Sequence, residues 1–127
     1  MTSAIHECVS RVFATRNAAH IAHWNTKSYA EHMALGDFYE GVVDILDNLV
    51  ETYQGNFGLI GLVVPAQTIA SNLTDPKLNI IKLLSAETDW LANNRDQIAG
   101  DICAIENILD ELVSLYLKTI YKLKNLS

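Results

Sequence analysis

Residues 28–55 read SYAEHMALGDFYEGVVDILDNLVETYQG, and this stretch decides the fold. Its apolar residues recur at steps of three and four, which is typical of a helix that buries one face. Ser28 and Glu31 have the spacing of a capping box, in which each side chain satisfies a free amide of the other residue. Gly55 predicts the end of the helix. We therefore expect one long amphipathic helix here.

The helical spacing continues on both sides of this stretch. It predicts an earlier helix from Ile5 to Trp24, which residues 25–27 interrupt. Further on, Asp75-Pro76 predicts an N-cap followed by proline at the first position of a third helix, which runs to Gly100. Asp101 is expected to cap a fourth helix that reaches almost to the end of the chain.

Residues 56–74 lack this regular spacing and contain glycines and Pro65. We interpret them as a long connection, with a short helix near residues 66–73. No segment shows the alternation of a strand. The sequence thus predicts an all-α protein with a single domain over residues 1–127. Its architecture is expected to be a ferritin-like four-helix bundle with a long crossover between the second and third helices.

Composition narrows the functional classes. Half of the 127 residues are apolar and the formal net charge is −6, so binding of DNA through a basic surface is disfavoured. The longest apolar run, residues 57–64, is far below the roughly 20 residues that span a bilayer, so no membrane association is expected. Cys8 and Cys103 match no metal-binding spacing. We expect two buried, reduced cysteines and a cytoplasmic protein.

Two groups of side chains have the chemistry of metal ligands. His20, His23 and His32 fall within thirteen residues, and an acidic stripe follows along the long helix at steps of four, three and four: Glu40, Asp44, Asp47 and Glu51. Each group alone has an ordinary explanation, as polar residues near a core or as a solvated helix face. Together, imidazoles and carboxylates are ligands that suit iron, zinc and manganese.

Helix geometry limits how these groups can meet. His32 and Asp47 are fifteen residues apart on one helix, which corresponds to about 22 Å along its axis. They cannot bind the same ion within one chain. Two copies of the helix packed antiparallel across a two-fold axis would bring the histidines of one chain to the carboxylates of the other, twice per dimer.

The sequence Ala22–Asn25 (AHWN), followed by His32, Asp47, Glu51 and Gly55, resembles the signature of the Dps-like miniferritins of the ferritin-like superfamily. The resemblance implies a ferroxidase centre at a two-fold subunit interface, where paired Fe(II) ions are oxidised by peroxide or O₂. It implies storage of the ferric product inside a homo-oligomer, usually a dodecameric cage. His23 and His32 would be nitrogen ligands, with Glu51 and Asp47 as the carboxylate ligands.

The chain also departs from that family. The usual aspartate, one turn after the second histidine, falls at Gly36. His20, one turn before His23, and Glu40, one turn after Gly36, are the metal-ligand candidates that would compensate. The lysine-rich tail by which some members hold DNA is absent. Trp24 is expected to be a core aromatic residue; its alternative, catalytic role is to accept oxidising equivalents from the site.

Two other functions remain open. The chain could be a non-catalytic helical protein that acts by assembly or by docking to a partner, and the glycine at position 36 favours this reading. A site rich in histidine with few carboxylates also suits a structural zinc ion that joins a dimer.

Overall fold

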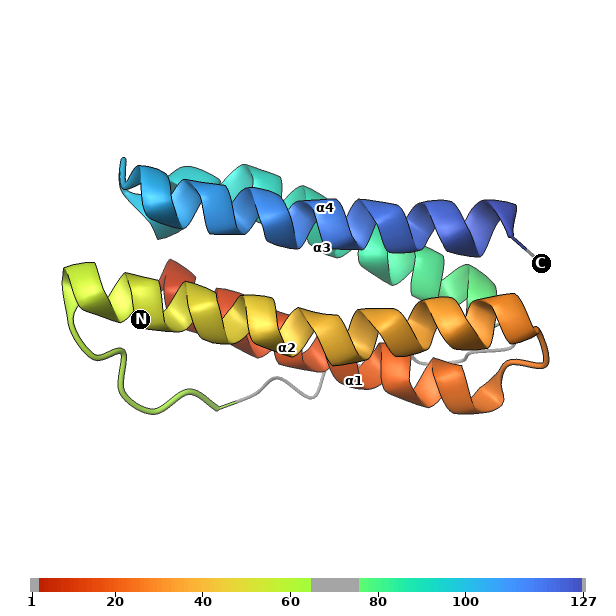
Figure 1. Ribbon diagram of the computed structural model, residues 1–127. Helices are drawn as coiled ribbons and strands as arrows, with labels where there is room; N and C mark the ends of the chain where they lie inside the picture. Colours follow the sequence, from red (N-terminus) through yellow and green to blue (C-terminus); the bar gives the residue numbers. More distant parts are fainter. Residues whose placement is uncertain (1–2, 65–75, 127) are drawn as a thin grey trace.

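The computed structural model describes residues 3–64 and 76–126, and these residues contain four α-helices and no strand. The helices are α1 (Ala4–Asn25), α2 (Tyr29–Phe57), α3 (Pro76–Ala99) and α4 (Cys103–Asn125). They pack as a four-helix bundle, in which α1 contacts α2 and α3, and α4 contacts the same two helices (Figure 1). The all-α bundle predicted from the sequence is confirmed.

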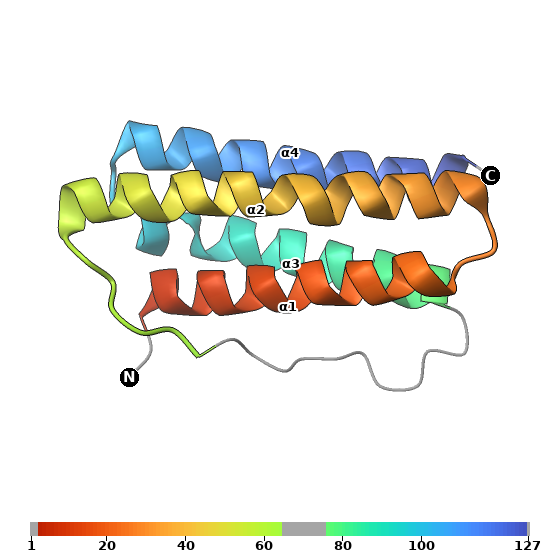
Figure 2. The same ribbon diagram turned by 60° about the horizontal axis from the view of Figure 1, so that its bottom comes forward.

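The directions of the helices are clear in Figure 2: α1 and α4 run one way along the bundle, and α2 and α3 run the other way. Consecutive helices α1 and α2 are therefore antiparallel neighbours, as are α3 and α4. The predicted short helix near residues 66–73 and the predicted cap at Asp75 lie outside the described residues. None of the described helices is long and apolar enough to cross a membrane.

The ends of α2 follow from local side-chain and backbone chemistry. Ser28 Oγ accepts a hydrogen bond from the Glu31 amide at 3.3 Å, which is one half of the predicted capping box. The other half is wrong, because the Ser28 amide donates to Thr26 Oγ and the Thr26 hydroxyl in turn donates to the Glu31 carboxylate. At the other end the helix continues past Gly55 and stops at Gly58, whose φ of 93° favours glycine. The predicted end at Gly55 was wrong because Gly55 itself remains helical.

The turn between α3 and α4 corrects a second prediction. Gly100 and Asp101 both have positive φ, of 52° and 67°, and α4 begins only at Cys103. The residue before it, Ile102, makes no side-chain cap. Asp101 therefore does not cap α4. It is a turn residue, because aspartate tolerates the left-handed conformation better than most side chains.

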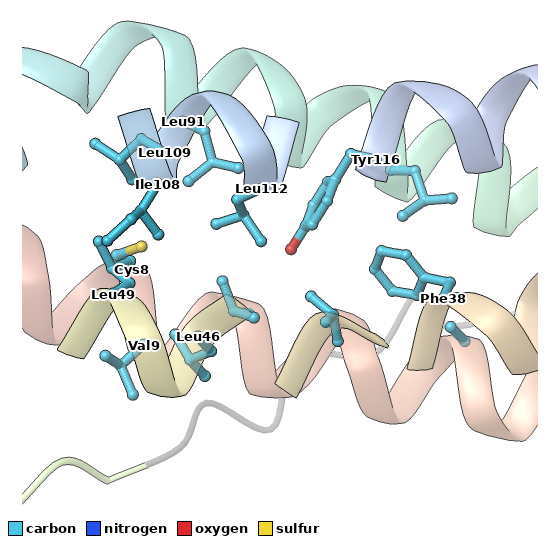
Figure 3. Close-up of a cluster of buried hydrophobic side chains, with 14 of the residues drawn as sticks. Cys8, Val9, Phe38, Leu46, Leu49, Leu91, Ile108, Leu109, Leu112 and Tyr116 are labelled. Atoms are coloured by element: carbon cyan, nitrogen blue, oxygen red, sulfur yellow. The ribbon is translucent and has the colours of Figure 1, made fainter. Parts of the chain in front are cut away.

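The core of the bundle is apolar and draws on all four helices (Figure 3). Phe38 on α2 and Tyr116 on α4 are fully buried and meet edge to face, with ring centroids 5.2 Å apart. Cys8 on α1 is also fully buried, as expected. Cys103, the first residue of α4, is exposed, so the expectation of two buried cysteines fails for that residue.

Candidate metal centre

His23 and His32 lie against each other where α1 meets the start of α2. Their imidazole rings are stacked, with centroids 3.6 Å apart and planes 19° from parallel. His23 Nδ1 lies 2.6 Å from the carbonyl oxygen of His32, and His32 Nδ1 lies 3.0 Å from the carbonyl oxygen of His23. The two residues therefore hold each other in place through reciprocal hydrogen bonds that link the two helices.

These hydrogen bonds fix the tautomer of both rings. A carbonyl oxygen only accepts, so each Nδ1 must carry a proton and donate it. In the neutral ring, Nε2 then holds a free lone pair. Among the described residues, neither Nε2 has a hydrogen-bond partner. Metal-binding histidines commonly have this arrangement, with one ring nitrogen donating to a backbone carbonyl and the other binding the ion.

Gly36 on α2 makes room for this pair. A Cβ atom at this position would lie 3.2 Å from His23 Cε1 and 3.5 Å from His23 Nδ1. Any side chain there would press on the imidazole and on its hydrogen bond to His32. The position at which the miniferritin pattern places an aspartate is thus taken up, in this chain, by the close approach of His23.

Tyr39 is part of the same cluster, although no motif of the sequence predicted it. Its ring stacks on His20 at 3.9 Å between centroids and meets His23 edge to face at 5.1 Å. The Arg16 guanidinium lies 5.4 Å from the centre of the Tyr39 ring. The only sequence signal was spacing, because Tyr39 follows His32 by seven residues and so lies on the same face of α2.

Trp24 is not a core residue. Its side chain is 67% exposed, and its ring lies 4.5 Å from His20 between centroids. The expectation of a core aromatic fails because Trp24 lies in the last turn of α1, on the outer side of the α1/α2 pair. We name the group His20, His23, Trp24, His32 and Tyr39 the histidine cluster.

Asp47 and Glu51 lie on the same outer face, nearer the end of α2. They line a shallow hollow of about 430 Å³ together with apolar residues of α1, α2 and the following segment: Val9, Phe13, Leu46, Val50 and Ile60. Both carboxylates are exposed, as is Glu40, which lies between the two groups. Within residues 3–64 and 76–126, no three metal-binding side chains come together. A single chain thus leaves the histidines and the carboxylates as separate groups.

A second polar cluster lies between α1 and α3. Arg11 bonds to Glu7 at 3.1 Å and to Glu87 at 2.9 Å, and it covers the Trp90 ring at 4.7 Å. Burial raises the pKa of Glu87, although the ion pair with Arg11 opposes the shift. Burial, reinforced by Glu87, raises the pKa of Cys8 to about 12.

The chain belongs to a family of unknown function, DUF5856, whose model matches residues 23–123. The match covers most of the last turn of α1, all of α2 and α3, and nearly all of α4. It therefore includes His23, His32, Asp47 and Glu51. No curated protein and no solved structure matches the chain.

Proposed function

We propose that this protein is a Dps-like miniferritin that binds Fe(II) at a site shared by two subunits and oxidises it. His23 and His32 of one chain are the nitrogen ligands, and Asp47 and Glu51 of a second chain are the oxygen ligands. Iron is the substrate of the site. The ferritin-like topology and a cage of twelve subunits are part of this proposal, supported by the common direction of α2 and α3 in Figure 2.

The stacked pair His23–His32 is the observation that carries the proposal. An imidazole binds a metal ion in the plane of its own ring, and these planes are nearly parallel with centroids 3.6 Å apart. Each ring therefore suits a separate ion.

The carboxylates supply the rest of the donor set. Imidazole nitrogen combined with carboxylate oxygen is a ligand set that suits Fe(II) and leaves positions open for an oxidant. His32, Tyr39 and Asp47 lie along one face of α2, so an antiparallel pairing of two such faces would bring the histidine end of each chain to the carboxylate end of the other.

The reaction needs two irons for each peroxide. Two Fe(II) ions give up one electron each, hydrogen peroxide accepts both electrons with two protons, and two Fe(III) ions and two water molecules result. The histidine pair and the carboxylates hold the two ions close together. Trp24, exposed beside His20, is proposed to take up oxidising equivalents that leave the site.

Anaerobic titration with Fe(II), followed by addition of hydrogen peroxide, tests this function. We expect about two Fe(II) bound per site and one peroxide consumed per two Fe(II). The mass of the assembly, measured on the same sample, should be that of an oligomer. Absence of Fe(II) binding by an intact oligomer would contradict the proposal.

Gly36 favours a second candidate function, a dimer joined by a structural metal ion such as zinc. With no side chain at position 36, the site has one hard anionic ligand fewer than the miniferritin pattern, and His23 occupies that space. Zinc accepts four ligands drawn from histidine and carboxylate. Titration with Zn(II) distinguishes the two: tight Zn(II) binding without peroxide-driven Fe(II) oxidation would favour the structural site.

A further inference from the structure

The outer face formed by α3 and α4 carries an apolar groove on the side of the bundle opposite the histidine cluster. The groove has a volume of about 380 Å³ and is lined by residues of both helices: Leu91, Ala92, Arg95, Leu109, Asp110, Val113, Ser114, Leu117 and Lys118. Leu117 in its wall is 52% exposed. An apolar groove with an exposed leucine at its edge is a surface suited to association.

The charges along the exposed side of α4 are separated by sign. Its first half carries Glu106, Asp110 and Glu111, and its second half carries Lys118, Lys122 and Lys124. Asp110 and Glu106 pair with Arg95 of α3, and Lys122 lies 3.9 Å from Asp37 of α2. Glu111 and Lys118 are exposed and have no ion-pair partner among the described residues.

This separation makes α4 complementary to a reversed copy of itself. Ser114, a small residue, lies midway between the two charged halves and on the outward side of the helix. In an antiparallel pair centred there, Lys118 of each chain lies beside Glu111 of the other, and Asn107 lies beside Tyr121. A parallel pair would instead set acid against acid and lysine against lysine, which is unfavourable.

We propose that a second copy of this chain docks on the α3/α4 face, with the two α4 helices antiparallel about Ser114. Leu117 of each chain covers apolar surface at the edge of the other chain's groove, and two Lys118–Glu111 pairs set the register. The interface is isologous, because the same surface serves both partners. It does not depend on the proposed metal site, which lies on the opposite face. Because two-fold interfaces on opposite faces build an open row of chains, it excludes the closed cage and keeps only the shared metal site of the proposed function.

Disulfide trapping tests the register directly. Ser114→Cys is made in a Cys103→Ser background, because Cys103 is exposed while Cys8 is fully buried. A residue on the two-fold axis meets its own copy, and a disulfide needs Cα atoms about 4.4–6.8 Å apart. We expect a covalent dimer yield at least fivefold above that of the matched control Asn107→Cys, which lies on the same exposed side of α4.

Charge reversal tests the pairing. Lys118→Glu or Glu111→Lys, added to the Ser114→Cys protein, should lower the trapped yield about fivefold, and the two together should restore it. Lys27→Glu, the same charge change in the α1–α2 turn, should leave the yield unchanged. Equal trapping at positions 114 and 107 would overturn the proposal. Charge reversals without effect, or a double variant that stays low, would overturn it as well.

Discussion

The two polar clusters of this bundle differ in what they leave unsatisfied. In the cluster between α1 and α3, Arg11 bonds to two carboxylates and covers Trp90. In both clusters, as throughout the described residues, no buried polar side-chain atom lacks a partner. In the histidine cluster, each Nδ1 is satisfied, whereas Nε2 of His23 and Nε2 of His32 reach solvent and have no partner among the described residues.

This difference distinguishes a polar cluster that stabilises the fold from one that can still bind a ligand. Polar groups that satisfy one another inside a fold orient its elements and have no capacity left for a ligand. Two imidazoles held rigidly by one nitrogen each, with the second nitrogen free, suit the metal site that we propose.

The core should dominate stability. Phe38→Ala removes a fully buried ring that packs against Tyr116, and we expect it to lower the free energy of unfolding by about 3–5 kcal/mol. Tyr29→Ala on the same helix, where the side chain is 77% exposed, is the control and should cost under about 1 kcal/mol. Urea denaturation measures both. Equal losses would show that α2 does not bury the face described here.

Removing the histidine pair should strongly weaken Fe(II) binding, with a smaller effect on folding than the loss of Phe38. In His23→Ala/His32→Ala both free Nε2 atoms are lost, and we expect Fe(II) affinity to fall at least about a hundredfold, which corresponds to roughly 2.7 kcal/mol. His6→Gln is the matched control, because His6 lies at the far end of α1 and bonds to the Ile60 carbonyl. Isothermal titration under anaerobic conditions compares them. Native-like affinity in the double variant would remove His23 and His32 from the site.

High pH should lower the free energy of unfolding through Cys8, whose buried thiol lies near Glu87. The pKa of Cys8 is about 12 in the folded protein and 9.0 for an ordinary thiol. The folded state therefore keeps its proton while the unfolded state loses it. Stability due to this thiol is complete below pH 9 and falls as pH rises toward 12. By about pH 10.5 the loss should reach about 2 kcal/mol.

Cys8→Ala should lack this part of the pH dependence, although it loses some packing at every pH. Unfolding of both proteins at several pH values, followed by circular dichroism, measures the difference. Parallel pH profiles for the native protein and Cys8→Ala would show that the thiol is not shielded.

The smallest effects are expected at the glycines of α2. Gly41→Ala should gain up to about 1 kcal/mol of stability, because its Cβ would meet only Leu115, at 3.9 Å. Gly36→Ala should gain less and should weaken Fe(II) binding, because its Cβ would push on His23. Gly36→Asp should weaken binding as well, although it restores the carboxylate of the miniferritin pattern. Tighter Fe(II) binding by Gly36→Asp would contradict this expectation and show that the His23 ring moves aside without cost.

The sequence predicted the helices well because their apolar spacing is regular and the bundle buries one face of each. It failed where a single residue decides a boundary. Gly55 and Gly58 are alike in sequence, and only Gly58 adopts positive φ. Asp101 resembles a cap, yet it completes a turn with Gly100. Whether a residue ends a helix, caps one or completes a turn depends on how the following segment packs. Local sequence patterns do not contain this information.

The candidate site was predicted as a set of residues and not as a geometry. Spacing placed His23 in the last turn of one helix and His32 in the first turn of the next, which is why both were chosen. The stacking of the two rings and the role of Gly36 are contacts between helices, so no periodicity reveals them. Tyr39 and Trp24 were misjudged for the same reason, since spacing gives a face of a helix but not its neighbours.

Mixing two inactive variants tests the shared site most directly. His32→Ala keeps the carboxylates, and Glu51→Ala keeps the histidines. If each site draws histidines from one chain and carboxylates from the other, a hybrid dimer contains one complete site. Random reassociation of equal amounts should then restore about a quarter of the native rate of peroxide-driven Fe(II) oxidation, whereas a mixture no more active than its two parent variants would contradict a site shared between subunits.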